Sequence, residues 1–415
     1  MPDSTTYDLI VIGGGAAGFF GALAFAGAAP SRRVLILEKA AAVLAKVRIS
    51  GGGRCNLTHA CFDPADLVRF YPRGAAALRG AFSRFQPSDT MTWFESRGVP
   101  LKIEPDGRVF PASNRSETIV DLLTAQAAAL GIEVRTLAAV ESLQRLPSGA
   151  GYTLSLRSGE TLTTPAVLLA SGGDRAGFAL AAGLGHTIVP PVPSLFTFQL
   201  ADQRLVGLSG VSVPEVILRL PADRIETHGP LLVTHWGLSG PAVLRLSAWG
   251  ARALFDCQYQ AALEINWLPG LNPETAYSRL LAIKNAQPRK KAAADPIGQI
   301  PQRLWASLLA AEGVEAQSWG ELKQPLLHRL AAALTRGQFA ITGKGAFKEE
   351  FVTAGGVKLD EVNFKTLQSK HSPGLFLAGE VLDIDGLTGG FNFQNAWTTG
   401  FLAGRGAAGF LSQTG

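Results

Sequence analysis

The first forty residues alternate between short apolar runs and a stretch of small residues. Residues 7–12 read YDLIVI, residues 16–26 are built from small and apolar residues, and residues 34–37 form a second apolar run. Continuous apolar runs rich in β-branched residues are typical of strands buried in a parallel sheet, and the longer stretch of small residues suits a helix. The pattern therefore predicts a strand, a helix and a second strand in succession.

Further along, the pattern changes character. Residues 167–170 and 375–378 are again short buried-strand runs, whereas residues 195–220 are dominated by short alternating runs. Residues 274–334 carry Ala, Leu, Gln and Lys at helical spacing. Pro190, Pro191 and Pro193 break the chain before the alternating region. We therefore expect an α/β part at both ends of the chain and different architecture between them.

Residues 9–31 carry no charge and are long enough to cross a bilayer. Their glycines, however, lie between the first predicted strand and helix, which fits elements buried inside a domain. The pattern of a signal peptide is also missing, because acidic Asp8 precedes the run without any Lys or Arg. The sequence thus predicts a cytoplasmic protein with no membrane partner.

Composition narrows the class of protein. A chain of 415 residues with 47% hydrophobic and 17% charged content is expected to fold into two or three domains. The net charge of +5 is modest for this size. Cys55, Cys61 and Cys257 are too few for a disulfide framework, which favours a reducing compartment. Neither a CxxC pair nor a His/Cys cluster occurs, so no metal is expected.

Gly13, Gly15 and Gly18 fall in GxGxxG spacing between the first strand and the helix. In a dinucleotide-binding turn the first glycine allows the sharp turn, the second lets a pyrophosphate approach the backbone, and the third lets helix and strand pack closely. Glu38 follows the second strand, where a carboxylate can accept hydrogen bonds from a ribose. These features predict a Rossmann-type site that either NAD or FAD would satisfy.

Residues 49–58 read ISGGGRCNLT. Three consecutive glycines make a flexible backbone whose amides can meet an anion or a flat ring, and Arg54 and Asn56 add side-chain donors. Cys55 is open to two interpretations, a redox thiol or a packed small residue, and the lack of a CxxC partner favours the second.

Two later segments complete the candidate site. Ser171, Gly172 and Gly173 follow one predicted strand, and Gly379-Glu380 closes another. Asp383 and Asp385, a glycine pair at 389–390 and a helical stretch from about Asn392 come next. Either aspartate could instead merely cap a turn.

These motifs, together with THWGLSGPAVLRLS at 234–247 and TAGGV at 353–357, occur in the order seen in the BaiN/YhiN-like family. The chain resembles this family of bacterial flavoproteins, related to aminoacetone oxidase within the glutathione-reductase-type FAD superfamily, over nearly its whole length. The resemblance implies an α/β fold with a discontinuous Rossmann-type FAD domain, an inserted β-barrel-like domain and a small helical domain. The expected boundaries are 1–190 and 345–415 for the FAD domain, 191–268 and 336–344 for the β-rich domain, and 269–335 for the helical domain.

The resemblance also implies FAD as the cofactor. In the family the helix after the last glycines directs its N-terminus at the flavin N1/O2 edge, where oriented amides stabilise the charge of the reduced ring. The implied cofactor contacts are Gly13, Gly15, Ala16, Ala17, Gly18, Glu38, Lys39, Ser50, Gly51, Gly52, Arg54, Cys55, Asn56, Val140, Ala170, Ser171, Gly172, Gly379, Glu380, Asp385, Gly390, Phe391 and Asn392.

The chain departs from the family pattern before the glycine triplet. Residues 40–46 read AAAVLAK where relatives are rich in glycine and lysine, so only Lys46 and Arg48 are available for any role of those lysines. His59 stands where an amide is more usual, and it is either a polar group near the site or a surface residue.

These features predict an FAD-dependent oxidoreductase that passes a hydride between flavin N5 and a small organic substrate or NAD(P)H. NAD(P)H would bind only transiently, because GKGA at 343–346 lacks the third glycine and the preceding strand of a second nucleotide turn. Two alternatives stay open: an oxidase of a small amine, and a flavin-containing protein that binds nucleic acid through PRKK at 288–291, which is the less favoured. GLSGP at 237–241 is interpreted as a structural turn rather than a substrate contact. The pattern assigns no catalytic residue, substrate or oligomeric state.

Overall fold

The computed structural model describes residues 7–345 and 352–414, so Ala346 of the GKGA segment lies outside the described residues. The chain divides into two compact units. Unit 1 comprises residues 1–191 and 353–415, and unit 2 comprises residues 192–352. Both ends of the chain therefore contribute to unit 1.

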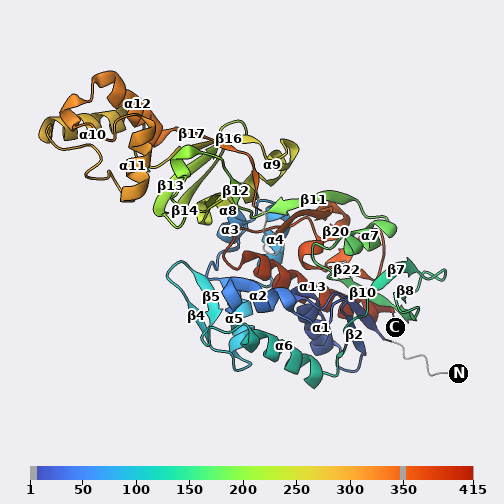
Figure 1. The fold of residues 1–415 in the computed structure, drawn as a ribbon. Helices are drawn as coiled ribbons and strands as arrows, with labels where there is room; N and C mark the ends of the chain where they lie inside the picture. Colours follow the sequence, from blue (N-terminus) through green and yellow to red (C-terminus); the bar gives the residue numbers. More distant parts are fainter. Residues whose placement is uncertain (1–6, 346–351, 415) are drawn as a thin grey trace. The chain divides into compact units, whose positions relative to one another are not determined.

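Unit 1 is built on a seven-stranded sheet in the order β20-β21-β22-β10-β1-β2-β6 (Figure 1). The pairs from β22 to β6 are parallel, whereas β20, β21 and β22 pair antiparallel. The strands are β1 (Leu9–Ile12), β2 (Val34–Leu37), β6 (Glu133–Arg135), β10 (Ala166–Leu169), β20 (Val362–Asn363), β21 (Gln368–Ser369) and β22 (Leu375–Leu377). Every residue of β1, β2, β10 and β22 is buried, which explains why these strands are continuous apolar runs.

Helices and small sheets complete unit 1. The antiparallel sheets are β3 (Thr58–His59), β5 (Arg108–Pro111) and β4 (Leu101–Ile103), and β7 (Val140–Arg145), β8 (Tyr152–Leu156) and β9 (Thr161–Thr164). The helices are α1 (Ala16–Ala28), α2 (Ala45–Gly53), α3 (Pro64–Leu67), α4 (Ala75–Phe82), α5 (Pro87–Glu95), α6 (Glu117–Ala129), α7 (Arg175–Gly183) and α13 (Phe391–Thr414).

Helices α1 and α13 lie against each other at backbone distance (Figure 1). A Cβ on Gly400 would lie 2.6 Å from the carbonyl oxygen of Ala17, and one on Gly404 would lie 2.1 Å from that of Gly21. Only residues without a side chain allow this approach. The crossing fixes the last element of the chain onto the first helix.

A two-stranded sheet of β11 (Ile188–Ser194) and β19 (Val352–Val357) marks where the chain leaves and re-enters unit 1. Gly355 of β19 lies so close to β11 that a Cβ on it would be 2.6 Å from the carbonyl oxygen of Pro190. The two ends of the insertion are therefore side by side.

Unit 2 contains a second seven-stranded sheet, antiparallel throughout, in the order β17-β16-β13-β14-β15-β12-β18. Only Thr342 separates β17 from β18, so one stretch of chain forms both ends of the sheet and closes it in a barrel-like manner. The strands are β12 (Phe198–Gln199), β13 (Ser212–Leu220), β14 (Ile225–Val233), β15 (Gly237–Ser239), β16 (Ala261–Asn266), β17 (Gly337–Ile341) and β18 (Gly343–Lys344).

The helices of unit 2 share one hydrophobic core with this sheet. Trp305 and Trp319 from the helical segment and Val213 and Ile265 from the strands belong to the same buried cluster. The β-rich and helical segments therefore belong to one compact unit, whose boundaries lie at 191/192 and 352/353. The helices are α8 (Pro241–Trp249), α9 (Ala251–Asp256), α10 (Pro273–Ala286), α11 (Gln302–Ala311) and α12 (Gln324–Thr335).

The GLSGP segment forms β15 and the turn into α8. A Cβ on Gly237 would lie 2.3 Å from the carbonyl oxygen of Phe198, and one on Gly240 would lie 2.9 Å from that of Pro230. Strand packing therefore accounts for both glycines.

Candidate cofactor site

The turn between β1 and α1 uses its three glycines differently. Gly13 has a φ of +111°, and its Cβ would lie 2.4 Å from the carbonyl oxygen of Ala170. A Cβ on Gly18 would lie 2.0 Å from the carbonyl oxygen of Gly13, whereas one on Gly15 would meet nothing within 4 Å. Packing within the protein thus requires Gly13 and Gly18, and the space over Gly15 is open to a ligand.

The N-terminus of α1 has free backbone N–H groups that can bind an anion. Its N-cap is Gly15, no side chain caps it, and its first turn holds no acidic residue. The first N–H groups of a helix and its dipole favour negative charge, as a pyrophosphate provides. Ala16 and Ala17 form the start of this helix, with side chains too small to cover the amides.

Glu38 lies at the carboxyl end of β2, beside the same turn. Its carboxylate accepts hydrogen bonds from the N–H of Gly14 and the N–H of Ala40, each 2.8 Å long. Its backbone oxygen accepts from the N–H of Ala138, which brings the chain leading to Val140 and β7 to this edge of the sheet. Lys39 forms an ion pair with Asp174 at 2.9 Å.

The glycine triplet ends α2 as an irregular loop. The backbone leaves helical geometry at Ser50, and Gly51 and Gly52 adopt left-handed conformations. A Cβ on Gly52 or Gly53 would meet nothing within 4 Å. Since left-handed φ values disfavour other residues, these glycines hold an open stretch of backbone.

The residues after the triplet are fixed by neighbours in unit 1. Arg54 pairs with Glu104 at 2.7 Å and lies over the Phe110 ring at 4.0 Å, so part of its hydrogen-bonding capacity is already used. Cys55 is fully buried, and this burial raises the pKa of its thiol to about 12. Its environment is that of a packed, protonated thiol.

Asn56 connects this motif with the start of α13. In the orientation that satisfies both of its polar atoms, its amide donates to the carbonyl of Thr58 at 3.1 Å and accepts from the N–H of Gly390 at 3.0 Å. Gly390 is itself pressed against Thr58, because a Cβ there would lie 2.4 Å from the Thr58 oxygen. Residues more than 300 positions apart are thereby joined.

A buried polar network sets the position of α13. Gln394 accepts from the hydroxyls of Thr58 at 2.5 Å and Thr90 at 3.0 Å and donates to Thr398. The Trp397 indole donates to the carbonyl of Leu57 at 2.9 Å. Buried polar groups with several partners specify one arrangement, so the helix N-terminus is held beside the glycine triplet.

The first residues of α13 are also anchored. Phe391 packs on His59 at 4.7 Å between ring centroids, and the buried Tyr71 hydroxyl donates to the Phe391 carbonyl at 2.6 Å. Asn392 exchanges two hydrogen bonds with the backbone of Gly386. His59 is therefore next to the start of α13 rather than on an isolated surface.

Glu380 lies beside the loop that follows β10. Its carboxylate accepts from the N–H of Thr353 at 3.0 Å and pairs with Lys46 at 2.6 Å. A Cβ added to Gly172 would lie 3.7 Å from it. Gly379 lies against the start of α1, since its Cβ would be 2.8 Å from that of Ala17.

Asp385, another implied cofactor contact, has a carboxylate that is buried against an arginine. Its carboxylate is fully buried and forms a two-fold ion pair with Arg73. Arg73 was not singled out from the sequence, because no local motif surrounds it and its partner is distant along the chain. Thr353 was noted only as the first residue of TAGGV, and its contact with Glu380 was not expected.

Among the described residues implied as cofactor contacts, Ser171 carries a buried polar atom that lacks a partner. The Ser171 hydroxyl is buried and has no hydrogen-bond partner among the described residues. Buried hydroxyls are normally satisfied, so this group, together with the open space over Gly15 and Gly52, fits a bound polar ligand. The residues present therefore suit a dinucleotide that extends from the α1 turn to the start of α13.

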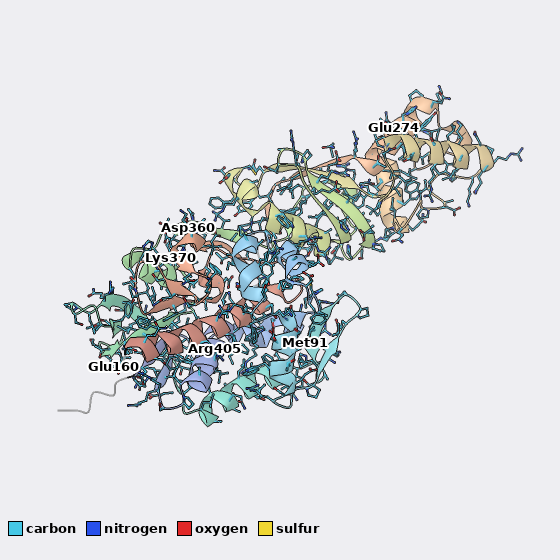
Figure 2. All side chains as sticks on the ribbon, turned by 180° about the vertical axis from the view of Figure 1, so that it is seen from behind. Met91, Glu160, Glu274, Asp360, Lys370 and Arg405 are labelled. Carbon is cyan, nitrogen blue, oxygen red and sulfur yellow. The ribbon has the colours of Figure 1, made fainter. Side chains whose placement is uncertain are left out.

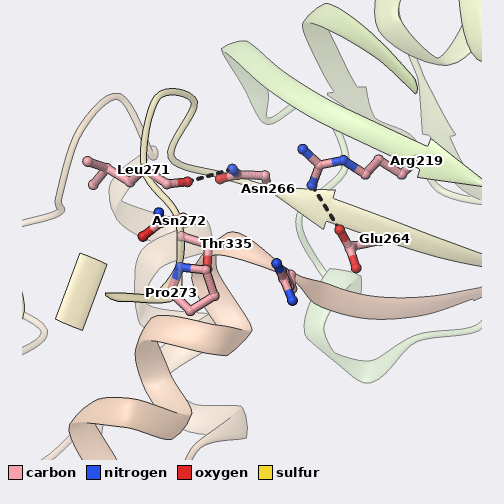
Figure 3. A pocket seen from close by; sticks show the side chains of 8 residues that line it. Arg219, Glu264, Asn266, Leu271, Asn272, Pro273 and Thr335 are labelled. Atoms are coloured by element: carbon pink, nitrogen blue, oxygen red, sulfur yellow. Dashed lines mark hydrogen bonds and ion pairs between the residues drawn. The ribbon is translucent and has the colours of Figure 1, made fainter. Parts of the chain in front are cut away.

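A cavity of about 270 Å³ in unit 2 has a different lining (Figure 3). None of the implied cofactor contacts borders it. Arg219 in its wall pairs with Glu264 at 2.8 Å, and Asn266 is bound to the backbone of Leu271.

Residues 7–406 match the family model described as the HI0933-like protein Rossmann domain. The chain belongs to the HI0933-like family. This assignment confirms the resemblance seen in the motifs, and it confirms FAD as the cofactor and an FAD-dependent oxidoreductase as the class of enzyme.

Two relatives match this chain nearly end to end. A 3-dehydro-bile acid delta(4,6)-reductase of Clostridium scindens is 29% identical over 409 residues, which cover 96% of this chain and 98% of the relative. A ribosomal RNA dihydrouridine synthase of Escherichia coli is 30% identical over 404 residues, which cover 95% and 96%.

Among solved structures, the 3-ketosteroid-delta4-(5alpha)-dehydrogenase of Rhodococcus jostii has a TM-score of 0.54 at 16% identity, with 98% of each chain covered. This likeness supports the fold of unit 1 as that of an FAD-binding flavoenzyme domain. Within the described residues, no helix combines the length and apolar character needed to span a membrane.

Proposed function

We propose that this protein reduces a carbon–carbon double bond conjugated to a carbonyl group. The observation that carries the proposal is the pair of nearly full-length relatives. A delta(4,6)-reductase of a 3-dehydro bile acid and a dihydrouridine synthase act on very different molecules. The Δ4,6 double bonds beside a 3-oxo group and the uracil double bond beside a ring carbonyl are nevertheless bonds of the same electronic type.

FAD supplies the hydride for this chemistry once it is reduced. The carbonyl draws electron density from the double bond, so the product forms by addition of one hydride and one proton. In our proposal, the α1 N-terminus at Gly15 faces the pyrophosphate and Glu38 accepts from the adenosine ribose. Glu380 and the Ser171 hydroxyl would meet the middle of the cofactor, and the N-terminus of α13 at Gly390 the flavin edge.

The remaining implied contacts belong to the same proposal. Lys39, Ser50, Gly51, Cys55, Asn56, Val140 and Asp385 would contact or shape the cofactor bed through backbone or side chain. NAD(P)H would reduce the flavin without a dedicated domain. Residues 269–335 would form the helical part of unit 2. A cytoplasmic location is part of this proposal, supported by the free state of Cys55, Cys61 and Cys257.

The test is a single-turnover reaction without oxygen. FAD-loaded protein is reduced chemically, freed of excess reductant and mixed with a 3-oxo-Δ4,6 steroid or with an unmodified ribosomal RNA fragment. Return of the flavin absorbance, together with a mass gain of two hydrogens in the product, would support the proposal. The saturated steroid and dihydrouridine-containing RNA are the matched controls.

The two arms distinguish the substrate class. Reaction with RNA alone would favour a base in RNA as the substrate, a candidate supported by the relative from Escherichia coli and by the exposed Arg289 and Lys291. If neither compound reoxidises the flavin but oxygen does so rapidly with an amine as the donor, the protein is an oxidase and the proposal fails.

A further inference from the structure

Outside the cofactor site, unit 1 contains a cluster of two histidines and one carboxylate. His186 follows α7, Glu361 ends the short 3-10 helix Leu359–Glu361, and His371 follows β21. One potential ligand atom from each residue lies within 4.8 Å of the others. The sequence offered no sign of this cluster, because His186 is 175 positions from Glu361 and the pattern lacks the short spacing of a metal motif.

We propose that His186, Glu361 and His371 bind a divalent transition-metal ion, with Zn²⁺ as the best match. Neutral imidazole and carboxylate are ligands that Zn²⁺ accepts at about 2.0–2.2 Å, which places tetrahedral ligand atoms roughly 3.4 Å apart. The Glu361 Oε2 atom is 3.1 Å from His186 Nδ1 and 3.5 Å from His371 Nε2. These two separations already match such a site.

The surroundings orient two of the three ligands. His186 Nε2 is 2.8 Å from the Ser369 hydroxyl, which leaves Nδ1 directed at Glu361. The Glu361 carboxylate also accepts from the N–H of Thr187 at 2.9 Å. The Ser369 hydroxyl on the outer nitrogen of His186 is the kind of partner regularly found at metal sites, whereas the N–H of Thr187 shares the Oε2 atom of Glu361 that faces the histidines.

Burial suits an ion with one open position. The His186 side chain is fully buried and that of Glu361 is 13% exposed, while that of His371 is 44% exposed. Asp360 and Lys370 lie close together beside the cluster, and the Lys370 ammonium is bound to the Asp360 carbonyl at 2.7 Å (Figure 2). Three protein ligands with a solvent-facing fourth side leave room for a water ligand.

The same residues also form a Ser369–His186–Glu361 chain that resembles a hydrolytic triad in its order. Ser369 is 5% exposed, and its hydroxyl accepts from the backbone N–H groups of His371 and Ser372. A nucleophile must reach its substrate, so the buried hydroxyl is a support for the imidazole and not a catalytic group.

A metal here would have a structural effect. It would connect the segment after α7, before the insertion, with the β20–β21 hairpin after it. Closing a long loop removes conformational freedom from the unfolded chain, so the ion would stabilise unit 1 across the interruption by unit 2.

The test uses the full-length, FAD-loaded protein without an affinity tag. After removal of metal with a chelator, Zn²⁺ is titrated in competition with a coloured chelator, and the melting temperature is followed in parallel. We expect one Zn²⁺ per chain and a rise in melting temperature. His371→Ala, at an exposed position, and Glu361→Gln should each weaken binding at least tenfold and abolish the rise.

His228→Ala is the matched control. His228 lies 3.2 Å from Glu215 in unit 2, an exposed His–Glu pair. Its replacement should leave Zn²⁺ binding unchanged. The proposal is overturned if the wild type takes up no Zn²⁺, or if uptake is insensitive to His371→Ala and Glu361→Gln. FAD content is measured in every variant, so loss of the cofactor fold is separated from loss of the metal.

Discussion

Gly15 differs from the other glycines of its turn in facing open space rather than the protein. Replacing it with Ala is sterically free within the chain, since its φ is −91°. We expect Gly15→Ala to change the unfolding free energy of the apoprotein by less than about 1 kcal/mol. FAD affinity should fall at least tenfold, because a methyl group would separate the pyrophosphate from the amides. Denaturant titration and flavin fluorescence measure the two quantities.

Gly18→Ala is the comparison variant. Its methyl group would lie 2.0 Å from the Gly13 carbonyl oxygen, so the backbone must shift. Overpacking of this kind costs about 1–3 kcal/mol, and we expect the apoprotein itself to be destabilised. Equal stability losses in both variants would contradict the division between packing and ligand roles.

The reactivity of the Cys55 thiol tests whether this residue is buried as the structure shows. Desolvation raises the pKa of its thiol to about 12, so its thiolate fraction at pH 8 is far below that of an ordinary thiol. Iodoacetamide at pH 8 should therefore label the exposed Cys257 and leave Cys55 unmodified until the protein is unfolded. Peptide mass analysis identifies the labelled positions, and rapid labelling of Cys55 in the native protein would show that the thiol is accessible.

The Arg73–Asp385 pair separates structural from cofactor roles at the end of the chain. The Asp385 side chain is fully buried and that of Arg73 is 16% exposed. Removing one member of a buried ion pair leaves the other charge without that partner in the interior. Arg73→Met should therefore destabilise the apoprotein by about 3–5 kcal/mol. Urea denaturation measures this loss.

Arg69→Met is its control. Arg69 forms an exposed ion pair with Asp66 at 3.5 Å. Pairs of this kind contribute at most about 1 kcal/mol. If Arg73→Met left the apoprotein as stable as Arg69→Met does, the buried pair would not hold this segment in place.

At the scale of elements, the glycine contacts between α1 and α13 decide whether the two ends of the cofactor bed stay together. A Cβ at Gly404 would lie 2.1 Å from the Gly21 carbonyl oxygen. Gly404→Ala should therefore force the helices apart, lower stability by about 1–3 kcal/mol and weaken FAD binding. Thermal denaturation and flavin release measure both effects.

Gly409→Ala lies in the same helix, where an added Cβ meets nothing within 4 Å. It should be neutral or stabilising by up to about 1 kcal/mol, because Ala favours helix more than Gly. A loss of stability equal to that of Gly404→Ala would indicate a general intolerance of α13 rather than a specific helix contact.

The elements also show how far the sequence was informative. The strand Val34–Leu37 and the turn at Gly13 could be predicted because their signals are local, namely apolar runs and glycine spacing. The link from Asn56 to Gly390 and the His186–Glu361 pair could not, because they join segments far apart in the chain. The Arg73–Asp385 ion pair could not be predicted either, because its two residues are far apart in the chain and an ion pair produces no periodic sequence pattern.

At the scale of the whole molecule, the insertion begins and ends at the paired strands β11 and β19. This adjacency predicts that residues 192–352 can be replaced by a short turn. The shortened protein should fold and bind FAD, as judged by its visible spectrum. The full-length protein, loaded with FAD in the same way, is the control.

The outcome of this deletion shows whether unit 1 can fold without unit 2. A colourless, aggregated product would show that unit 1 depends on unit 2 for stability. Retained FAD binding would show that unit 1 folds without unit 2.

The division of unit 1 between the two ends of the chain affects how the enzyme matures. During synthesis at about 5–20 residues per second, the ribosome spends roughly 10 to 30 seconds on unit 2 before β22 and α13 appear. Until then β10 has an unpaired edge and α1 an uncovered face. Because the proposed FAD contacts include residues of the last segment, we expect a nascent chain to gain its flavin only after this segment has been made.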